Sequence, residues 1–215
     1  MKLYGYWRSS TAYRVRIALN LKGLTAEHVP VHLVRDGGEH HRPEYKALNP
    51  QEAVPTLVTD GGAVLTQSLA ICEWLEERHP RPPLLPPDSE ARARVRAFAL
   101  AIGCEIHPLT NLRVLSHLTG AMGLSDADKL AWYRHWTTVG LAQLEALVAG
   151  HPGTGRFVQG DSPTLADVCL VPQLYNARRF EVDLAPYPTL VRIDSACREL
   201  PAFAAAAPEQ QPDAV

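Results

Sequence analysis

A run of prolines divides this chain of 215 residues into two parts with different patterns. Within "RHPRPPLLPPD", residues 78–88, five prolines stand in eight positions. Proline lacks a backbone N–H and fixes φ, so this stretch can continue neither a helix nor a central strand. The sequence therefore predicts a domain boundary here, with one domain over residues 1–82 and a second over residues 88–215.

The residues before the proline run alternate between strand and helix patterns. "KLYGY" predicts a strand, "TAYRVRIALNLK" a helix that ends at Gly23, and "EHVPVHL" a second strand. A charged connection, Val34–Lys46, predicts a short helix or a mobile loop, and "VPTLV" and "AVLTQ" then predict a hairpin around "TDGG". Ser68 is the expected N-cap of the helix "LAICEWLEERH". This order predicts an α/β domain whose first two strands are parallel.

The residues after the proline run have helical patterns only. "SEARARVRAFALAIGCEIHPLTNLRVLSHL" predicts one helix bent at Pro108, and "DADKLAWYRHWTTVGLAQLEALVA" has the period of a bundle helix. "SPTLADVCLVPQLYNARRF" carries Thr164 and Asp167 at the spacing of a capping box, with Asp in place of Glu. "YPTLVRIDSACREL" predicts a last helix, and the tail "EQQPDAV" is expected to fray. The second domain is therefore expected to be all-α.

Composition argues against several classes of function. The formal net charge is −2 and the pI is near 6.5, so the chain has no global attraction to nucleic acid. No apolar run approaches the roughly 18 residues of a membrane span and the start carries no signal peptide, which predicts a cytoplasmic protein. The four cysteines are Cys72, Cys104, Cys169 and Cys197. Their spacing shows neither a CxxC motif nor a metal-ligand pattern, which disfavours both a metal site and redox catalysis by protein thiols.

Three hydroxyl side chains, Ser9, Ser10 and Thr11, follow the first predicted strand and begin the first helix. A helix N-terminus offers unpaired N–H groups and the positive end of the helix dipole, and the hydroxyls add further donors. This arrangement is suited to a small anion, although no neighbouring His or acid activates a hydroxyl as a nucleophile. From these residues alone, an ordinary N-cap with polar neighbours is an equally good interpretation.

Two further features indicate where a peptide would bind. Val54 precedes Pro55 at the entry of a strand, and a cis bond there would turn the Val54 main chain outward toward an extended peptide. Gln67 and Ser68 begin another helix and so offer a second anion site. A short anionic peptide could place a thiolate at one of these helix N-termini and a carboxylate at the other.

The motifs S-S-x-x-x-R-V-R-I-A-L, N-P-x-x-x-V-P-T-L, Q-S-x-A-I and T-L-A-D occur in this order along nearly the whole chain. In that order and spacing they resemble the glutathione S-transferase superfamily, and the first motif resembles its zeta class. Thr11 stands where that class usually has Cys. A threonine at this position, together with the stretches "WRS.T", "GC.IHP..N.R" and "ARRF.VDL.PYP", makes the sequence similar to the maleylpyruvate isomerases, which are relatives of the maleylacetoacetate isomerases. The resemblance implies a thioredoxin-like domain that binds glutathione, an all-helical domain that binds the second substrate, and a homodimer.

The resemblance also implies roles for individual residues. The glutathione thiolate would lie against Ser9, Ser10 and Thr11, the cysteinyl main chain would pair with Val54, and Gln67 and Ser68 would hold the γ-glutamyl end. Further glutathione contacts would come from His40, His107 and Asn111, the last two lying four apart on one helix face. Arginine forks suit carboxylates, and the expected substrate-binding residues are Arg8, Arg113 and Arg179, with Arg178 as the alternative to Arg179. Without the resemblance, these arginines would be assigned to the solvated surface and the helix histidine to the core.

The implied activity is a glutathione-dependent cis–trans isomerisation of an enone dicarboxylate, with glutathione as a cofactor that is not consumed. The sequence leaves open whether the substrate is maleylpyruvate or maleylacetoacetate. One alternative is a transferase that conjugates or dehalogenates small α-halo acids, and another is a non-catalytic binding protein of the same fold. A thiol–disulfide oxidoreductase is the weakest alternative, because residue 11 is not a cysteine.

Overall fold

The computed structural model describes residues 1–214 and divides into two compact units. Unit 1 contains Met1–Leu84 together with the C-terminal segment from Glu199, and unit 2 contains Leu85–Arg198. The sequence analysis assigned everything from residue 88 onward to the second domain, so the two divisions differ over the C-terminal segment.

The C-terminal segment joins unit 1 because its helix α10 (Pro201–Ala206) packs against helix α1 (Ser10–Leu21). Arg16 Nε of α1 donates to the Ala206 carbonyl over 3.0 Å, and Asn20 Nδ2 donates to the Ala202 carbonyl over 2.9 Å. These bonds join residues almost two hundred positions apart, which a local sequence pattern does not encode.

A four-stranded sheet forms the centre of unit 1, in the order β2-β1-β3-β4. Its strands are β1 (Lys2–Gly5), β2 (Glu27–Pro30), β3 (Thr56–Val58) and β4 (Val64–Thr66). Strand β1 pairs with β2 in parallel and with β3 in antiparallel orientation, and β3 and β4 form an antiparallel hairpin. The predicted α/β domain, its parallel first pair and its hairpin are therefore confirmed.

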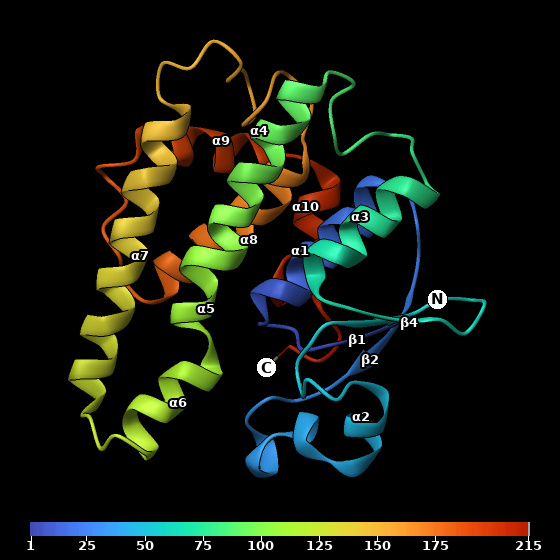
Figure 1. The fold of residues 1–215 in the computed structure, drawn as a ribbon, viewed down its shortest axis with the longest axis vertical. Coiled ribbons are helices and arrows are strands. Elements are labelled where there is room, and N and C mark those ends of the chain that lie inside the picture. The colour runs from blue at the N-terminus through green and yellow to red at the C-terminus, as the bar shows by residue number, and fades with distance from the viewer. Residues whose placement is uncertain (215) are drawn as a thin grey trace. The chain divides into compact units, whose positions relative to one another are not determined.

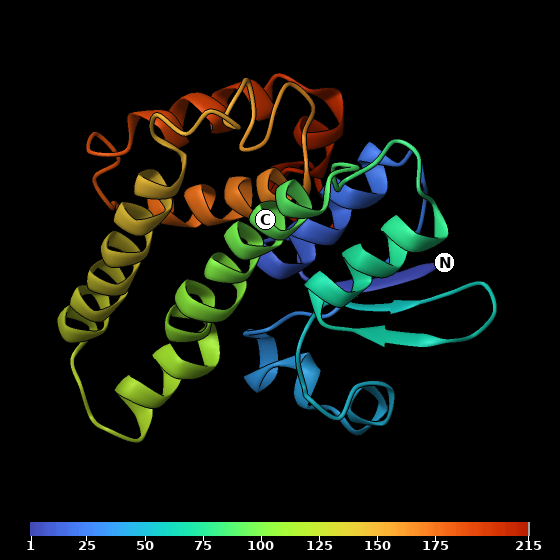
Figure 2. The ribbon, with the colours of Figure 1, turned by 45° about the horizontal axis from the view of Figure 1, so that its top comes forward.

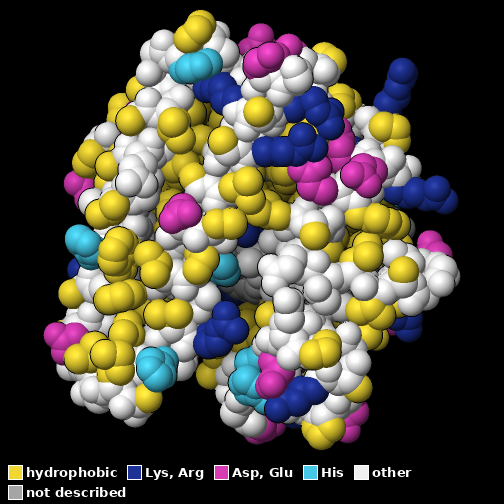
Figure 3. Space-filling model, in the orientation of Figure 1, with side chains coloured by type: hydrophobic (Ala, Val, Ile, Leu, Met, Phe, Trp, Pro, Cys, Tyr) yellow, Lys and Arg dark blue, Asp and Glu magenta, His cyan; other side chains and the backbone are white. Residues whose placement is uncertain are grey.

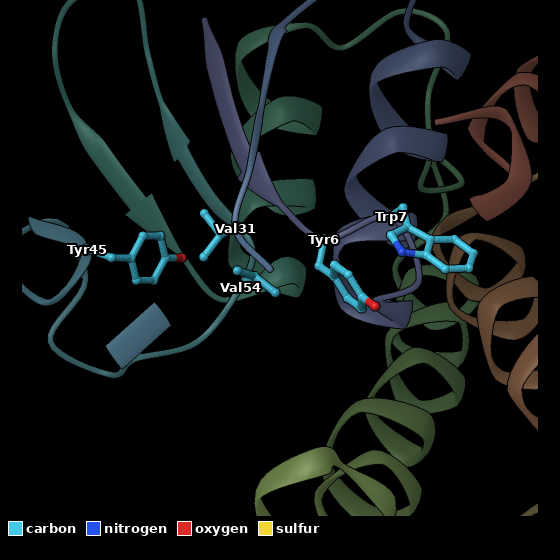
Figure 4. Packing of buried hydrophobic residues seen from close by; sticks show 5 residues of the cluster. All are labelled: Tyr6, Trp7, Val31, Tyr45 and Val54. Atoms are coloured by element: carbon cyan, nitrogen blue, oxygen red, sulfur yellow. The ribbon is translucent and has the colours of Figure 1, made fainter. Parts of the chain in front are cut away.

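Helices α1 and α3 (Ser68–Arg78) pack against each other on one face of this sheet, and α2 (Pro43–Leu48) lies beyond the other face (Figures 1 and 2). The charged connection before α2 contains two short 3-10 turns, Arg35–Gly37 and Glu39–His41. A cluster of buried side chains joins the turn after β1 to the segment before β3 (Figure 4); its members are Tyr6, Trp7, Val31, Tyr45 and Val54.

Unit 2 consists of helices, as the sequence predicts. They are α4 (Ser89–Leu100), α5 (His107–Thr110), α6 (Leu112–Gly120), α7 (Asp126–Val148), α8 (Leu165–Arg179) and α9 (Pro188–Arg198). Helix α8 is buried along most of its length and packs against α4 and α9 (Figure 1). Helix α7 also packs against α9, so the apolar faces of these helices form one core.

The prediction of one bent helix over residues 89–118 is wrong. Helix α4 passes into a π-helical segment, Ala101–Ile106, then into the short α5, and the chain leaves helical geometry at Asn111, where φ is −75° and ψ is 160°. Asn111 Oδ1 accepts a hydrogen bond from the Val114 N–H over 3.0 Å and so caps α6. Asparagine side chains favour such caps over helix interiors, which accounts for a break at this residue. Pro108 occupies the first turn of α5, where its missing N–H costs little.

The predicted capping box at the start of α8 is confirmed. The Asp167 carboxylate accepts from the Thr164 N–H over 2.7 Å and from the Thr164 hydroxyl over 2.9 Å. It also accepts from the Val158 N–H over 2.9 Å, so it links the preceding loop to the helix. Asp167 is fully buried, and burial raises its pKa to about 6.

The predicted fraying of the C-terminal tail is wrong for the described residues. Asp213 Oδ2 accepts from the Trp7 N–H over 3.0 Å, and Ala214 packs against the cluster of Tyr6 and Trp7. Gln211 Nε2 donates to the Ala207 carbonyl over 2.8 Å. These contacts attach the tail to unit 1; Val215 lies outside the described residues.

Two surface properties bear on the classes of partner. Among the helices of residues 1–214, none combines the length and the apolar character that crossing a bilayer requires. On the face drawn in Figure 3, Lys and Arg side chains are interspersed with Asp and Glu and do not form a continuous basic stripe.

Candidate functional site

Helix α1 begins at the hydroxyl-rich turn that follows β1. Ser9 is its N-cap, because Ser9 Oγ accepts from the Ala12 N–H over 3.3 Å, and Ser10 is its first residue. No acidic side chain lies in the first turn, so nothing neutralises the positive end of the helix dipole there. The N-cap interpretation of Ser9 is therefore correct, and anion binding at this helix N-terminus stays a prediction.

A chain of hydrogen bonds brings three predicted site residues together. Thr11 Oγ1 donates to the Val54 carbonyl over 2.8 Å, and it lies 2.8 Å from Ser9 Oγ. A hydroxyl has one proton, so the Ser9 hydroxyl is the donor in its bond to Thr11. Thr11, the residue that departs from the usual zeta-class pattern, thus links the start of α1 to the segment before β3.

The Val54–Pro55 peptide bond is cis, as the sequence analysis anticipated. Val54 itself is 9% exposed, and its side chain lies in the cluster with Val31 and Tyr6 (Figure 4). A carbonyl oxygen has two lone pairs, so the Val54 carbonyl can accept a second hydrogen bond beside that from Thr11.

Helix α3 begins at Ser68, which makes Ser68 its first residue and corrects the prediction that it is the N-cap. The N-cap is Gln67, whose φ of 68° lies in the left-handed region, where residues other than glycine are uncommon and are found at functional sites. Gln67 Nε2 donates to Gln51 Oε1 over 2.9 Å. The first turn of α3, like that of α1, carries no acidic side chain.

Ser68 is buried and its hydroxyl contacts a charged side chain from α1. Arg14 Nη1 donates to Ser68 Oγ over 3.3 Å, and Arg14 is 1% exposed. The sequence analysis gave Arg14 no role of its own, although Arg14 is the first arginine of the motif S-S-x-x-x-R-V-R-I-A-L. The available signal was the position of Arg14 in a helix whose other residues are mostly apolar.

His40 lies in the second 3-10 turn of the charged connection, and its ring lies against that of His41, with the centroids 3.8 Å apart and the ring planes tilted by 40°. Partial burial, and after it the neighbouring His41, lower the pKa of His40 below its ordinary value of 6.5. The lowered pKa favours the neutral form of the ring at pH 7. Its Nδ1 is buried and has no hydrogen-bond partner within residues 1–214.

The predicted site residues of unit 2 lie on different elements from those expected. His107 is the first residue of α5, whereas Asn111 is the N-cap of α6. Because the helix ends between them, their spacing of four does not place them on one helix face, and that expectation is wrong. Arg113 is exposed in the first turn of α6.

The structure distinguishes the two adjacent arginines at the end of α8. Arg178 Nη2 donates to the buried Asp194 Oδ2 over 2.6 Å, so Arg178 forms an ion pair inside unit 2. The Arg179 guanidinium instead lies 4.9 Å from the centre of the Phe180 ring. In unit 1, the Arg8 guanidinium lies in the same way 5.0 Å from the Trp7 ring. Such cation–π contacts orient a guanidinium without neutralising it.

The cysteines and the acidic side chains do not form a metal-ligand cluster within the described part of the chain. None of the four cysteines, all within the described residues, forms a disulfide bond, and burial raises the pKa of the Cys197 thiol far above its ordinary value. Over residues 1–214, no group of three or more His, Cys, Asp or Glu side chains has the arrangement of a metal site.

Comparisons with known proteins agree with this architecture. Residues 3–83 match the family described as "Glutathione S-transferase, N-terminal domain". The chain is 53% identical to the maleylpyruvate isomerase of a Ralstonia species over 213 residues, which covers 99% of both chains.

Two solved structures superpose over the whole chain. The holo structure of maleylpyruvate isomerase, described as a bacterial glutathione S-transferase of the zeta class, has a TM-score of 0.96 at 52% identity and covers 100% of both chains. Maleylacetoacetate isomerase of Methylobacterium extorquens, crystallised with malonate and glutathione, has a TM-score of 0.96 at 45% identity and the same coverage. With its thioredoxin-like sheet, its helical second unit and this full-length identity, the chain belongs to the zeta class of the glutathione S-transferase family.

Proposed function

We propose that the protein is a glutathione-dependent cis–trans isomerase of an enone dicarboxylate, either maleylpyruvate or maleylacetoacetate. The observation that carries this proposal is the 53% identity to a maleylpyruvate isomerase with 99% of both chains covered. The match therefore includes both the thioredoxin-like unit and the helical unit of the chain.

The donor set of unit 1 fits glutathione, which carries a thiol and two carboxylates. Two helix N-termini, those of α1 and α3, have no acidic side chain in their first turns, and each has hydroxyl groups beside it. A helix N-terminus stabilises a negative charge through its N–H groups and its dipole. One N-terminus for the thiolate and one for a carboxylate would accommodate two of the three anionic groups of this tripeptide.

Individual residues of unit 1 would hold the cofactor as follows. Ser9, Ser10 and the N-terminus of α1 would stabilise the negative charge on sulfur, with the Ser9 proton turned from Thr11 Oγ1 toward the sulfur. Thr11 would remain bound to the Val54 carbonyl beside it. The free lone pair of the Val54 carbonyl would accept from the cysteinyl N–H. Gln67 and Ser68 would bind the γ-glutamyl end at the start of α3.

The contacts expected from His40, His107 and Asn111 remain part of the proposal. A neutral His40 offers one N–H donor and one acceptor at pH 7, in keeping with its lowered pKa. Asn111 uses its carbonyl oxygen to cap α6, which leaves its Nδ2 group able to donate to a ligand.

When bound, glutathione supplies a thiolate that adds reversibly to a carbon of the cis double bond, which permits rotation to the trans isomer and leaves the cofactor intact. The part of the protein is to keep the thiol ionised and to stabilise the negative charge that develops on the enone oxygen. It must also orient two carboxylates, which requires fixed cations.

The cations proposed for the two carboxylates are Arg8, Arg113 and Arg179. Arg178 pairs with the buried Asp194, and Arg179 is the residue that the family resemblance places at the substrate. Planar guanidinium groups bind carboxylates through two parallel hydrogen bonds, which fixes the orientation of the substrate as well as its affinity.

The assay follows the loss of cis-enone absorbance for maleylpyruvate and for maleylacetoacetate, each with and without a small amount of glutathione. The proposal expects turnover of at least one diacid that requires glutathione and yields its trans isomer. No turnover of either diacid in the presence of glutathione would overturn it.

We also propose that the protein is a homodimer, as its family resemblance implies. Large apolar side chains exposed on long helices of unit 2 support this; they include Leu100 of α4 and Val139 and Leu147 of α7. Sedimentation equilibrium should give twice the mass of the 23.6 kDa chain, and a monomeric mass at micromolar concentration would contradict the proposal.

A further inference from the structure

Arg14 is a charged side chain in the interior of unit 1 for which the fold provides too few partners. It lies in α1, is 1% exposed, and makes one hydrogen bond, from Nη1 to Ser68 Oγ over 3.3 Å. Its Nε and Nη2 are buried without a hydrogen-bond partner within residues 1–214, and no carboxylate there forms an ion pair with it. A buried guanidinium whose donors are mostly unsatisfied is strongly unfavourable, so an arginine that serves only the fold would be expected to have more of its donors satisfied.

Arg16, two positions further along α1, shows what a structural arginine looks like in the same helix. Its Nε donates to the Ala206 carbonyl over 3.0 Å and its Nη2 donates to the Trp7 carbonyl over 2.9 Å. Arg16 therefore joins α10 and the turn after β1 to the helix. Arg14 makes no comparable connection, and its one partner is the residue that begins α3.

The bond to Arg14 determines what the Ser68 hydroxyl can do. A guanidinium group can only donate, so Ser68 Oγ is the acceptor in this bond. The single proton of Ser68 is then free for an acceptor at the N-terminus of α3, and the bond fixes the position of the oxygen that carries it. Ser68 is 5% exposed, so this arrangement is largely shielded from water.

The charge of Arg14 adds to that of the helix. The first turn of α3 has no acidic side chain, and the helix dipole is positive at this end. In a buried environment a full positive charge acts over a longer distance than at the surface, because water screens it less. The start of α3 thus combines a helix N-terminus, an oriented hydroxyl donor and an uncompensated buried cation, and each of these favours an anion.

We infer that Arg14 is a positioning residue that supplies charge to a carboxylate bound at the start of α3 and orients Ser68 toward it. The ligand class is the α-carboxylate of an amino-acid end group. This inference rests on the proposed function, in which that group is the α-carboxylate of the γ-glutamyl residue of glutathione. Arg14 acts through Ser68 and through its charge, and it is distinct from the residues proposed to touch the cofactor.

The test compares two ligands that differ only in this carboxylate. They are glutathione and γ-aminobutyryl-cysteinylglycine, the same tripeptide without the α-carboxylate, and their Kd values are measured by titration calorimetry on the full chain. The variants are Arg14→Gln, Arg14→Lys and, as the matched control, Arg16→Gln. Urea unfolding of each variant records any loss of stability.

A charge-assisted interaction of this kind corresponds to about a ten- to hundredfold change in affinity. We expect Arg14→Gln to weaken glutathione binding by about this factor while it changes the affinity for the analogue less than about threefold. Arg14→Lys should retain part of the discrimination, because it keeps the charge and loses the geometry. Arg16→Gln should lower the stability and leave the ratio of the two Kd values unchanged.

Two results would overturn the inference. One is an equal loss of affinity for both ligands in Arg14→Gln, which would make Arg14 a structural residue. The other is unchanged glutathione binding in that variant. If Arg14→Gln fails to fold, Ser68→Ala takes its place: the inference then requires Ser68→Ala to weaken glutathione more than the analogue, and an equal effect on both ligands contradicts it.

Different results would contradict the role inferred for Arg14 and the proposed isomerase function. A wild-type protein that binds glutathione but isomerises neither diacid would contradict the proposed function and leave the carboxylate test fully interpretable. A wild-type protein that binds glutathione and the analogue equally well would contradict the inference even if isomerisation is observed.

Discussion

The backbone N–H of Trp7 donates to Oδ2 of Asp213 over 3.0 Å, across 206 positions of sequence. Trp7 belongs to the turn that leads from β1 to Ser9, and the Ser9 N–H itself donates to the Tyr6 carbonyl over 2.9 Å. The C-terminal tail therefore helps to fix the backbone from which the hydroxyl-rich start of α1 begins.

Removal of this acceptor should destabilise the protein. Asp213→Ala leaves the N–H of the buried Trp7 unsatisfied, which costs about 1–3 kcal/mol. Asp213→Asn keeps a carbonyl oxygen at the same position and should cost less than half as much. The free energy of urea unfolding measures both; equal stability of Asp213→Ala and wild type would show that the contact contributes nothing.

The hydroxyl chain at the start of α1 predicts unequal roles for its two members. The Thr11 proton is committed to the Val54 carbonyl and the Ser9 proton to Thr11 Oγ1, so Ser9 donates to sulfur only when its hydroxyl turns away from Thr11. Ser9 is the hydroxyl that the family resemblance places at sulfur. Ser9→Ala should therefore raise the pKa of bound glutathione and slow turnover more than Thr11→Ala. The thiolate absorbance of bound glutathione as a function of pH gives that pKa directly. A fully active Ser9→Ala together with an inactive Thr11→Ala would reverse the two roles.

Arg179 should contribute to the binding of the diacid and not to that of glutathione. Arg179→Met is expected to lower kcat/KM for the diacid about ten- to hundredfold, since a charge-assisted hydrogen bond is worth roughly 1.5–3 kcal/mol. The Kd of glutathione should hardly change, and a neutral electrophile should lose much less rate than the diacid.

Arg178→Met serves as the control for Arg179→Met. It breaks the ion pair with the buried Asp194, so it should lower stability and act equally on charged and neutral substrates. An equal loss toward both kinds of substrate in Arg179→Met would instead assign Arg179 to the fold.

Asp167 should make stability depend on pH. Burial raises its pKa to about 6 in the folded protein, from 3.8 in the unfolded chain. Between these two pH values Asp167 is protonated in the folded state and ionised in the unfolded state. The contribution of Asp167 to the free energy of unfolding is therefore complete below about pH 3.8 and is lost as pH rises to about 6. The loss is on the order of 3 kcal/mol.

Asp167→Asn has no group that titrates in this range and removes the effect. Urea unfolding of wild type and Asp167→Asn at pH 4.5 and pH 7 gives the change in their stability difference. The account expects the wild type to lose stability relative to the variant as pH rises, and a stability difference that is the same at both pH values would contradict it.

The features that sequence predicted correctly are local ones. The parallel pair follows from two strand patterns joined by a crossover helix, and the hairpin follows from two strand patterns around a short turn. The capping box of Thr164 and Asp167 follows from a spacing of three. The cis bond at Pro55 was anticipated from the residue types and the position at a strand entry.

The predictions that were wrong depend on contacts between residues far apart in the sequence, or on backbone angles that the residue type does not determine. Asp213 finds Trp7, so a polar tail that looks frayed is in fact attached. Gln67 adopts a left-handed φ and shifts the N-cap away from Ser68. Arginine is a residue type that usually lies at the surface, and only the packing of α1 against α3 reveals that Arg14 is buried.

The central claim is that glutathione acts as a cofactor and is not consumed, and a thiol count during turnover tests it most directly. The protein is given a hundredfold molar excess of diacid over glutathione, and free thiol is titrated after the cis enone has disappeared. The account predicts complete conversion to the trans isomer with the glutathione thiol fully recovered. Conversion that stops after one equivalent of glutathione, with the thiol lost to a conjugate, would show a transferase instead of an isomerase.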